Sequence, residues 1–152
     1  MISDNNRRAL IYHIMKGLEK NNVRAFSSSS DDLLYDRSAD GVIRMIETRI
    51  YIGLNDAETK EQKYDTEKYL GILKKVCQSY HVAFSVDIED SGYFHEDGTY
   101  VEETSFVLLM IGTDREVVRK IAKDLCAFFN QEAVLITENQ LDGYFVSEEL
   151  PV

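Results

Sequence analysis

From residue 42 onward, the hydrophobic pattern of this chain switches between the two-residue period of a strand and the 3.6-residue period of a helix. This alternation limits the fold more than any other feature, because each period fixes which side chains share a face. The pattern predicts strands over 42–54, 82–89, 99–111 and 133–137, and helices over 65–80 and 114–130. The predicted order is therefore strand, helix, strand, strand, helix, strand.

Two local signals refine this order. Asp97-Gly98 lies between the second and third strands and is typical of a type I′ hairpin turn, in which both central residues have positive φ. Residues 106–111 are apolar on both faces, which is typical of a central strand covered on both sides. A sheet face closed by another subunit would explain the same run.

The order resembles the ferredoxin-like superfold over residues 42–147. The resemblance implies an α+β domain, with a βαββαβ antiparallel sheet and two helices on one face. An amphipathic N-terminal helix is predicted within residues 1–21, followed by a linker or mobile loop over 22–41. A short fifth strand is predicted over 143–146, and residues 148–152 form a tail. This superfold hosts many unrelated functions, so the resemblance implies no activity.

Positive charge is almost absent from the second half of the chain. Residues 1–75 contain 13 Lys/Arg and 12 Asp/Glu, whereas residues 76–152 contain 4 and 15, so the halves carry net charges of +1 and −11. No Lys or Arg lies between Lys75 and Arg115. Binding to a phosphate backbone requires cations, so this charge argues against a direct nucleic-acid ligand. It favours metal cations, cationic ligands or basic proteins.

The predicted hairpin between the second and third strands is the main candidate site. It combines carboxylates with aromatic residues, which often anchor interfaces when they lie on exposed loops. The predicted partner-binding residues are Asp87, Glu89, Asp90, Tyr93, Phe94, Glu96, Asp97, Tyr100, Glu102 and Glu103. The alternatives are a hairpin that only adds solubility, and aromatic residues that pack back on the sheet.

In size and charge the chain is similar to small acidic inhibitors from phages and mobile elements, such as anti-CRISPR proteins. That similarity implies a non-enzymatic acidic binding protein, acting as a nucleic-acid mimic on the cationic groove of a partner, such as a nucleic-acid enzyme. The alternative is a dimeric ligand-sensing or structural module, in which the open sheet face forms a homodimer. A small enzyme is the third hypothesis.

No motif predicts catalysis, a metal or a cofactor. The three histidines, His13, His81 and His95, have no neighbouring ligand at metal-binding spacing. We therefore predict no catalytic residues, no metal site and no cofactor. Cys77 and Cys126 lie on apolar helical faces and are predicted to be reduced, buried residues. Because the cysteines are predicted to be reduced, the predicted location is the cytoplasm, and an intracellular host compartment would fit equally well. No apolar run is long enough to span a bilayer, so no membrane partner is predicted.

Overall fold

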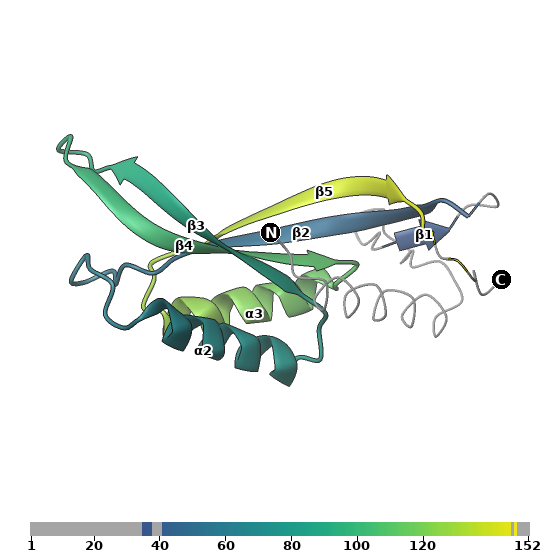
Figure 1. Cartoon of the computed structure of the whole chain (residues 1–152), viewed down its shortest axis with the longest axis horizontal. Coiled ribbons are helices and arrows are strands. Elements are labelled where there is room, and N and C mark those ends of the chain that lie inside the picture. Colours follow the sequence, from purple (N-terminus) through teal and green to yellow (C-terminus); the bar gives the residue numbers. More distant parts are fainter. Residues whose placement is uncertain (1–34, 38–40, 147, 149–152) are drawn as a thin grey trace.

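The second strand, β2, lies in the middle of an antiparallel sheet and pairs along both of its edges (Figure 1). The computed structural model describes residues 35–37, 41–146 and 148. In chain order, the elements are β1 (Tyr35–Arg37), β2 (Ile43–Gly53), α2 (Thr66–Ser79), β3 (Ser85–Phe94), β4 (Tyr100–Ile111), α3 (Arg115–Phe128) and β5 (Leu135–Gly143).

The four long strands lie in the order β5-β2-β4-β3, and all neighbours are antiparallel. β1 pairs with the first residues of β2, ahead of the point where β4 begins to pair. Both helices cover the same face of the sheet (Figure 1). The predicted α+β class is confirmed, and the arrangement is compatible with a ferredoxin-like fold.

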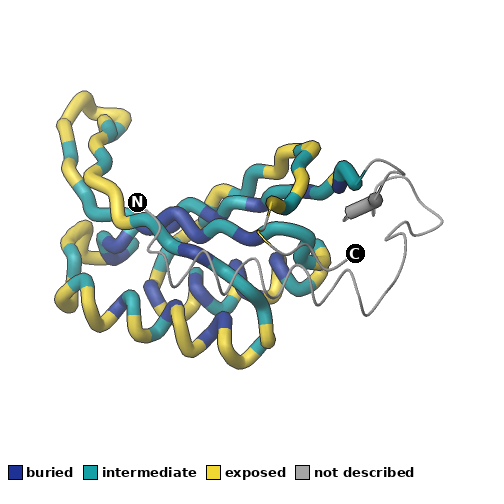
Figure 2. Tube along the Cα trace, turned by 45° about the vertical axis from the view of Figure 1, so that its right-hand side comes forward, coloured by how far each residue is buried: buried dark blue, intermediate teal, exposed yellow. Residues whose placement is uncertain are grey.

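The core fills the space between the sheet and the two helices, where the buried residues lie in Figure 2. β2 and β4 supply side chains from alternate positions, such as Ile50, Ile52, Phe106 and Leu108, all of which are fully buried. Alternation places these residues on one face, as the sequence pattern predicts. Phe129, just after α3, joins this core by edge-on contact with the ring of Phe106.

The boundaries of the helices follow from local chemistry. Asp65 precedes α2 and accepts a hydrogen bond from the backbone N–H of Lys68 at 2.9 Å. Asp114 precedes α3 and accepts from the N–H of Glu116 at 2.7 Å. Such caps satisfy N–H groups that have no partner within the helix. Asn130 lies just beyond α3 with a positive φ of 48°, a left-handed conformation that commonly ends a helix.

Replacing the α2 cap should weaken the fold by a measurable amount. We expect Asp65→Ala to lower the free energy of unfolding by about 1 kcal/mol, because the first turn of α2 loses a hydrogen-bond acceptor. Urea denaturation followed by circular dichroism measures this change. Glu61→Ala, in the exposed loop before α2, is the control and should leave the midpoint unchanged. Equal midpoints for both variants would show that the cap is not stabilising.

Four predicted details differ or cannot be compared. β5 runs to Gly143, well past the predicted end at 137, because its polar residues pair with β2 where neither α2 nor α3 covers the sheet. The predicted strand over 143–146 is therefore not a separate element. The predicted N-terminal helix lies outside the described residues, as does most of the predicted linker. Within that linker, residues 35–37 form β1.

The β3–β4 turn is a three-residue loop and not a type I′ turn. The N–H of Gly98 donates to the carbonyl of His95, and the N–H of His95 donates to the carbonyl of Thr99. A type I′ turn would need a positive φ at both Asp97 and Gly98, but only Gly98 has one, of 87°. This is a turn followed by one left-handed residue, the next most common way to close a hairpin.

Among the described residues, no helix is long and apolar enough to cross a membrane.

Candidate functional site

The β3–β4 hairpin projects well beyond the rest of the sheet (Figure 1). The last pair between β2 and β4 is Gly53 with Ser105, whereas β3 and β4 remain paired out to Phe94 and Tyr100. We call residues 89–104 the arm. Most of it is exposed (Figure 2). The base of the arm lies beside the loop that joins β2 to α2, and the candidate site is between them.

A groove of about 530 Å³ separates the base of the arm from this loop. Its lining includes three carboxylates, one tyrosine and two side-chain amides from the loop. These side chains are Asp90, Glu102, Glu103, Tyr100, Asn55 and Gln62. A second hollow of about 260 Å³ shares Asn55 and Glu103 with the groove and also reaches Tyr93. Glu103 therefore lies between two recesses.

Glu103 is held in place by the end of β2. Its carboxylate accepts a hydrogen bond from the backbone N–H of Asn55 at 3.0 Å. It also lies directly against Gly53, where a Cβ atom would come within 2.5 Å of the Glu103 carboxylate. Real Cβ atoms do not approach so closely, so this position of the carboxylate requires glycine at 53.

Tyr100 occupies its place for a similar reason. Its ring lies across Gly92, where a Cβ would be 2.9 Å from two ring carbons. The ring also packs against Phe94 at a centroid distance of 5.2 Å. Tyr100 is 54% exposed, so part of the ring remains open to a ligand. The groove thus combines carboxylates with an aromatic surface, a combination suited to a cation that carries a planar group.

The loop beside the groove is anchored by a buried carboxylate. Asp56 is 5% exposed and accepts hydrogen bonds from the side chain of Asn130 at 2.9 Å and from the N–H groups of Glu58 and Thr59. The hydrogen bond from Asn130, followed by those from the two N–H groups, lowers the pKa of Asp56 below its ordinary value of 3.8. Asp56 therefore fixes the loop that presents Asn55 and Gln62.

This lowered pKa makes the stability of the fold depend on pH. Because the folded pKa of Asp56 lies below the unfolded one, its carboxylate stabilises the fold above about pH 4, and this contribution disappears as pH falls through the folded pKa. We expect Asp56→Asn to lower the melting temperature by a few degrees at pH 7 and by less at pH 3. Glu58→Gln is an exposed control. An equal loss at both pH values would contradict this role.

The predicted site residues fall into separate places. Asp90, Tyr100, Glu102 and Glu103 line the groove, and Tyr93 lines the second hollow, where its ring meets that of His95 edge-on. The other arm residues, which are exposed and outside both recesses, are Glu89, Phe94, Glu96 and Asp97. Asp87 lies in the body of the sheet and is half-buried. Whether these residues bind a protein partner stays a prediction.

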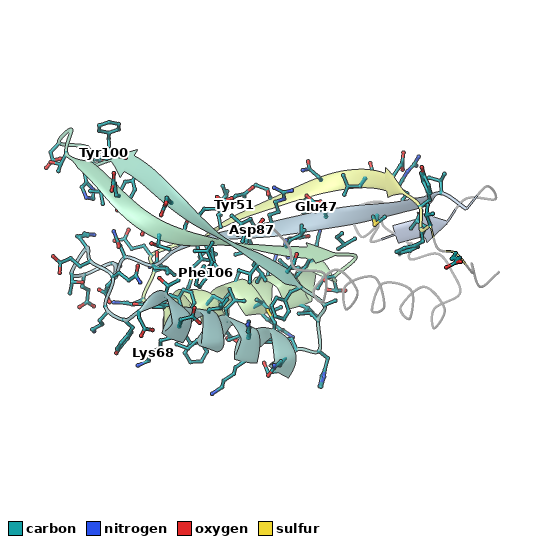
Figure 3. The ribbon with its side chains drawn as sticks, viewed as in Figure 1. Glu47, Tyr51, Lys68, Asp87, Tyr100 and Phe106 are labelled. Carbon is teal, nitrogen blue, oxygen red and sulfur yellow. The ribbon has the colours of Figure 1, made fainter. Side chains whose placement is uncertain are left out.

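Asp87 belongs to a different face. It pairs with Val107 of β4, and Val107 pairs in turn with Tyr51 of β2. Figure 3 shows Tyr51 and Glu47 on the side of the sheet away from the helices. Tyr51 and Glu47 both bond to the side chain of Arg49 and raise the pKa of that guanidinium, with the Arg49 Nε to Glu47 Oε1 distance at 2.9 Å. This polar row is separate from the groove.

Little in the sequence pointed to the residues that complete the groove. Asn55 and Gln62 come from a polar loop, where such residues are common. Gly53 and Gly92 contribute no side chain, and their role appears only from the positions of Glu103 and Tyr100. Among the described residues, no group of three or more His, Cys, Asp or Glu is placed to hold a metal ion.

Solved structures with this fold include an enzyme. A phage SAM lyase in its apo state matches with a TM-score of 0.50 and 20% sequence identity, covering 69% of this chain and 91% of that chain. A phage SAM lyase in complex with S-methyl-5′-thioadenosine matches with a TM-score of 0.49 and 20% identity, covering 66% and 89%. No protein-family model and no curated protein matches the chain. At 20% identity, the likeness establishes a shared fold.

This comparison corrects the functional prediction. The non-enzymatic inhibitor, its nucleic-acid mimicry and the statement that the chain is not an enzyme are wrong, because the match is to an enzyme. The resemblance to anti-CRISPR proteins is not supported either. The prediction failed because size and net charge are shared by many unrelated proteins. An acidic surface attracts a small cationic ligand as well as it attracts a basic protein.

Proposed function

We propose that this chain is an enzyme that binds S-adenosylmethionine (SAM) in the groove at Glu103 and cleaves it as a lyase. The observation that carries the proposal is the fold that the chain shares with the apo phage SAM lyase over 91% of that enzyme. The chemistry of the groove is compatible with it. SAM carries a sulfonium, an ammonium group and a planar adenine, and the groove offers carboxylates and an aromatic ring.

The proposed placement follows from charge. Glu103 lines both recesses and its carboxylate is fixed, so it would face the sulfonium. Glu102 and Asp90 would attract the ammonium group, and the open part of the Tyr100 ring would pack against the adenine. The amides of Asn55 and Gln62 would bond to the polar edges of the substrate.

The proposed reaction breaks the bond between Cγ of the methionine part and sulfur. The carboxylate of the substrate attacks its own Cγ, a C–O bond forms, and the electron pair of the C–S bond moves to sulfur. The products are methylthioadenosine and a five-membered lactone that keeps the ammonium group. No water, proton or redox partner is consumed, so the protein has to bind, orient and desolvate the substrate.

The test is to incubate the purified full-length chain with SAM and to quantify methylthioadenosine by mass spectrometry. We expect release in proportion to enzyme concentration, with the lactone in equal amount. A folded chain that neither binds SAM in calorimetry nor releases methylthioadenosine would overturn the proposal. Release of the thioether with an unsaturated amino acid in place of the lactone would retain the lyase and replace the displacement step.

A further inference from the structure

The outer part of the arm is a two-stranded ribbon with an uncovered aromatic surface. From Thr104 back to Tyr100, β4 pairs with β3 and no longer with β2. Phe94, at the end of this ribbon, is 71% exposed, although its ring is fully apolar. Two strands without a covering layer are marginally stable in water. The length of this ribbon and the exposure of Phe94 therefore favour a partner that packs on it.

The charge of the arm indicates that the partner surface is basic. The arm contains six carboxylates and no Lys or Arg. The outer surface of the helices has the opposite character. Its exposed cations are Lys68, Lys74, Lys75, Arg119, Lys120 and Lys123, whereas its exposed acids are Glu67 and Glu116. A chain with a net charge of −10 thus carries a basic surface that matches its own acidic arm.

The aromatic residues of the arm and the basic surface of the helices both lie on the helix side of the sheet where the arm begins. Phe106 points into the core beneath the helices and pairs with Ile88, and side chains alternate along a strand. Phe94 and Tyr100, which pair with each other, are an even number of residues away and so begin on the helix side. A two-fold axis would make the two contacts, arm to helices and helices to arm, equivalent.

We propose that the arm binds the helical surface of a second copy of this chain, with Phe94 as the apolar anchor and the carboxylates facing the partner's lysines and arginines. This proposal does not depend on the enzymatic function. Since each copy contributes one arm and one helical surface, the dimer has two equivalent contacts. Electrostatic pairing of this kind weakens with salt.

A charge-swap experiment with the full-length chain tests the proposal. One variant carries Glu96→Lys and Glu102→Lys on the arm, and a second carries Lys74→Glu and Lys120→Glu on the helices. We expect the wild type to sediment as a dimer, and each variant alone to bind itself at least about 100-fold more weakly. When the two variants are mixed, both contacts join opposite charges again, and the heterodimer should recover wild-type affinity.

Two further variants show whether the effect is specific to the proposed contact. Glu58→Lys with Glu61→Lys makes the same charge change on an exposed loop outside both surfaces, and its dimer affinity should stay within about threefold of wild type. Phe94→Ser should weaken the dimer without changing the circular dichroism spectrum. A wild type that is monomeric at every concentration overturns the proposal, even if it captures other basic proteins. Variants that dimerise as well as wild type, or a mixture that does not recover, also overturn it.

Discussion

Glu103→Gln is expected to raise KM for SAM by about 10- to 100-fold and to leave kcat unchanged or slightly higher. The carboxylate of Glu103 would face the sulfonium, and losing a half-buried charge pair costs about 1.4–2.7 kcal/mol of binding. The sulfonium charge disappears as the C–S bond breaks, so the pair is weaker in the transition state than in the bound substrate. An interaction lost from the bound substrate raises KM and cannot lower kcat.

Steady-state kinetics on methylthioadenosine release, together with calorimetric titration of SAM, separate these effects. Glu96→Gln is the matched control, since Glu96 is an exposed carboxylate at the tip of the same arm and outside the groove. Its KM should stay within about threefold of wild type. A large fall in kcat for Glu103→Gln with an unchanged KM would contradict the placement beside the sulfonium. It would assign Glu103 to proton removal instead.

The sequence was sufficient for the α+β class and for the order of the elements from β2 to β5, because its hydrophobic periods are strong where the core is packed. The alternation through Ile50 and Ile52, and the helical stripe that ends at Phe129, correspond to side chains that are buried. The prediction failed where burial does not control the pattern. β5 continues through Glu138 and Asn139, which are neighbours and therefore face opposite sides of the sheet. Both are exposed, so the sequence there does not alternate between apolar and polar residues.

The site was predictable in part, for a similar reason. Carboxylates and aromatics gathered in one hairpin are visible in the sequence, and four of these residues do line the groove. Their use was not visible, because a carboxylate run serves a basic protein and a small cation equally well. The other wall of the groove comes from Asn55 and Gln62, some 40 residues earlier. Only the pairing of β2 with β4 brings that loop to the arm.

Gly53→Ala tests whether the position of Glu103 matters, and not only its charge. The new methyl group would occupy the space of the Glu103 carboxylate, which must swing away and lose its hydrogen bond from the N–H of Asn55. The displaced group is the end of a flexible side chain, so we expect the free energy of unfolding to change by less than about 1 kcal/mol. KM for SAM should rise nearly as much as in Glu103→Gln.

A double-mutant cycle makes this test specific. If Gly53→Ala acts by displacing Glu103, its effect on KM should be small once Glu103 is already glutamine, and the two changes should not add. Gly71→Ala is the matched glycine control. Gly71 is exposed on α2, and a Cβ there would meet nothing within 4 Å. It should stabilise the chain by about 0.5–1 kcal/mol with unchanged kinetics. Additive effects of Gly53→Ala and Glu103→Gln would show that glycine at 53 acts on substrate binding by a route other than Glu103.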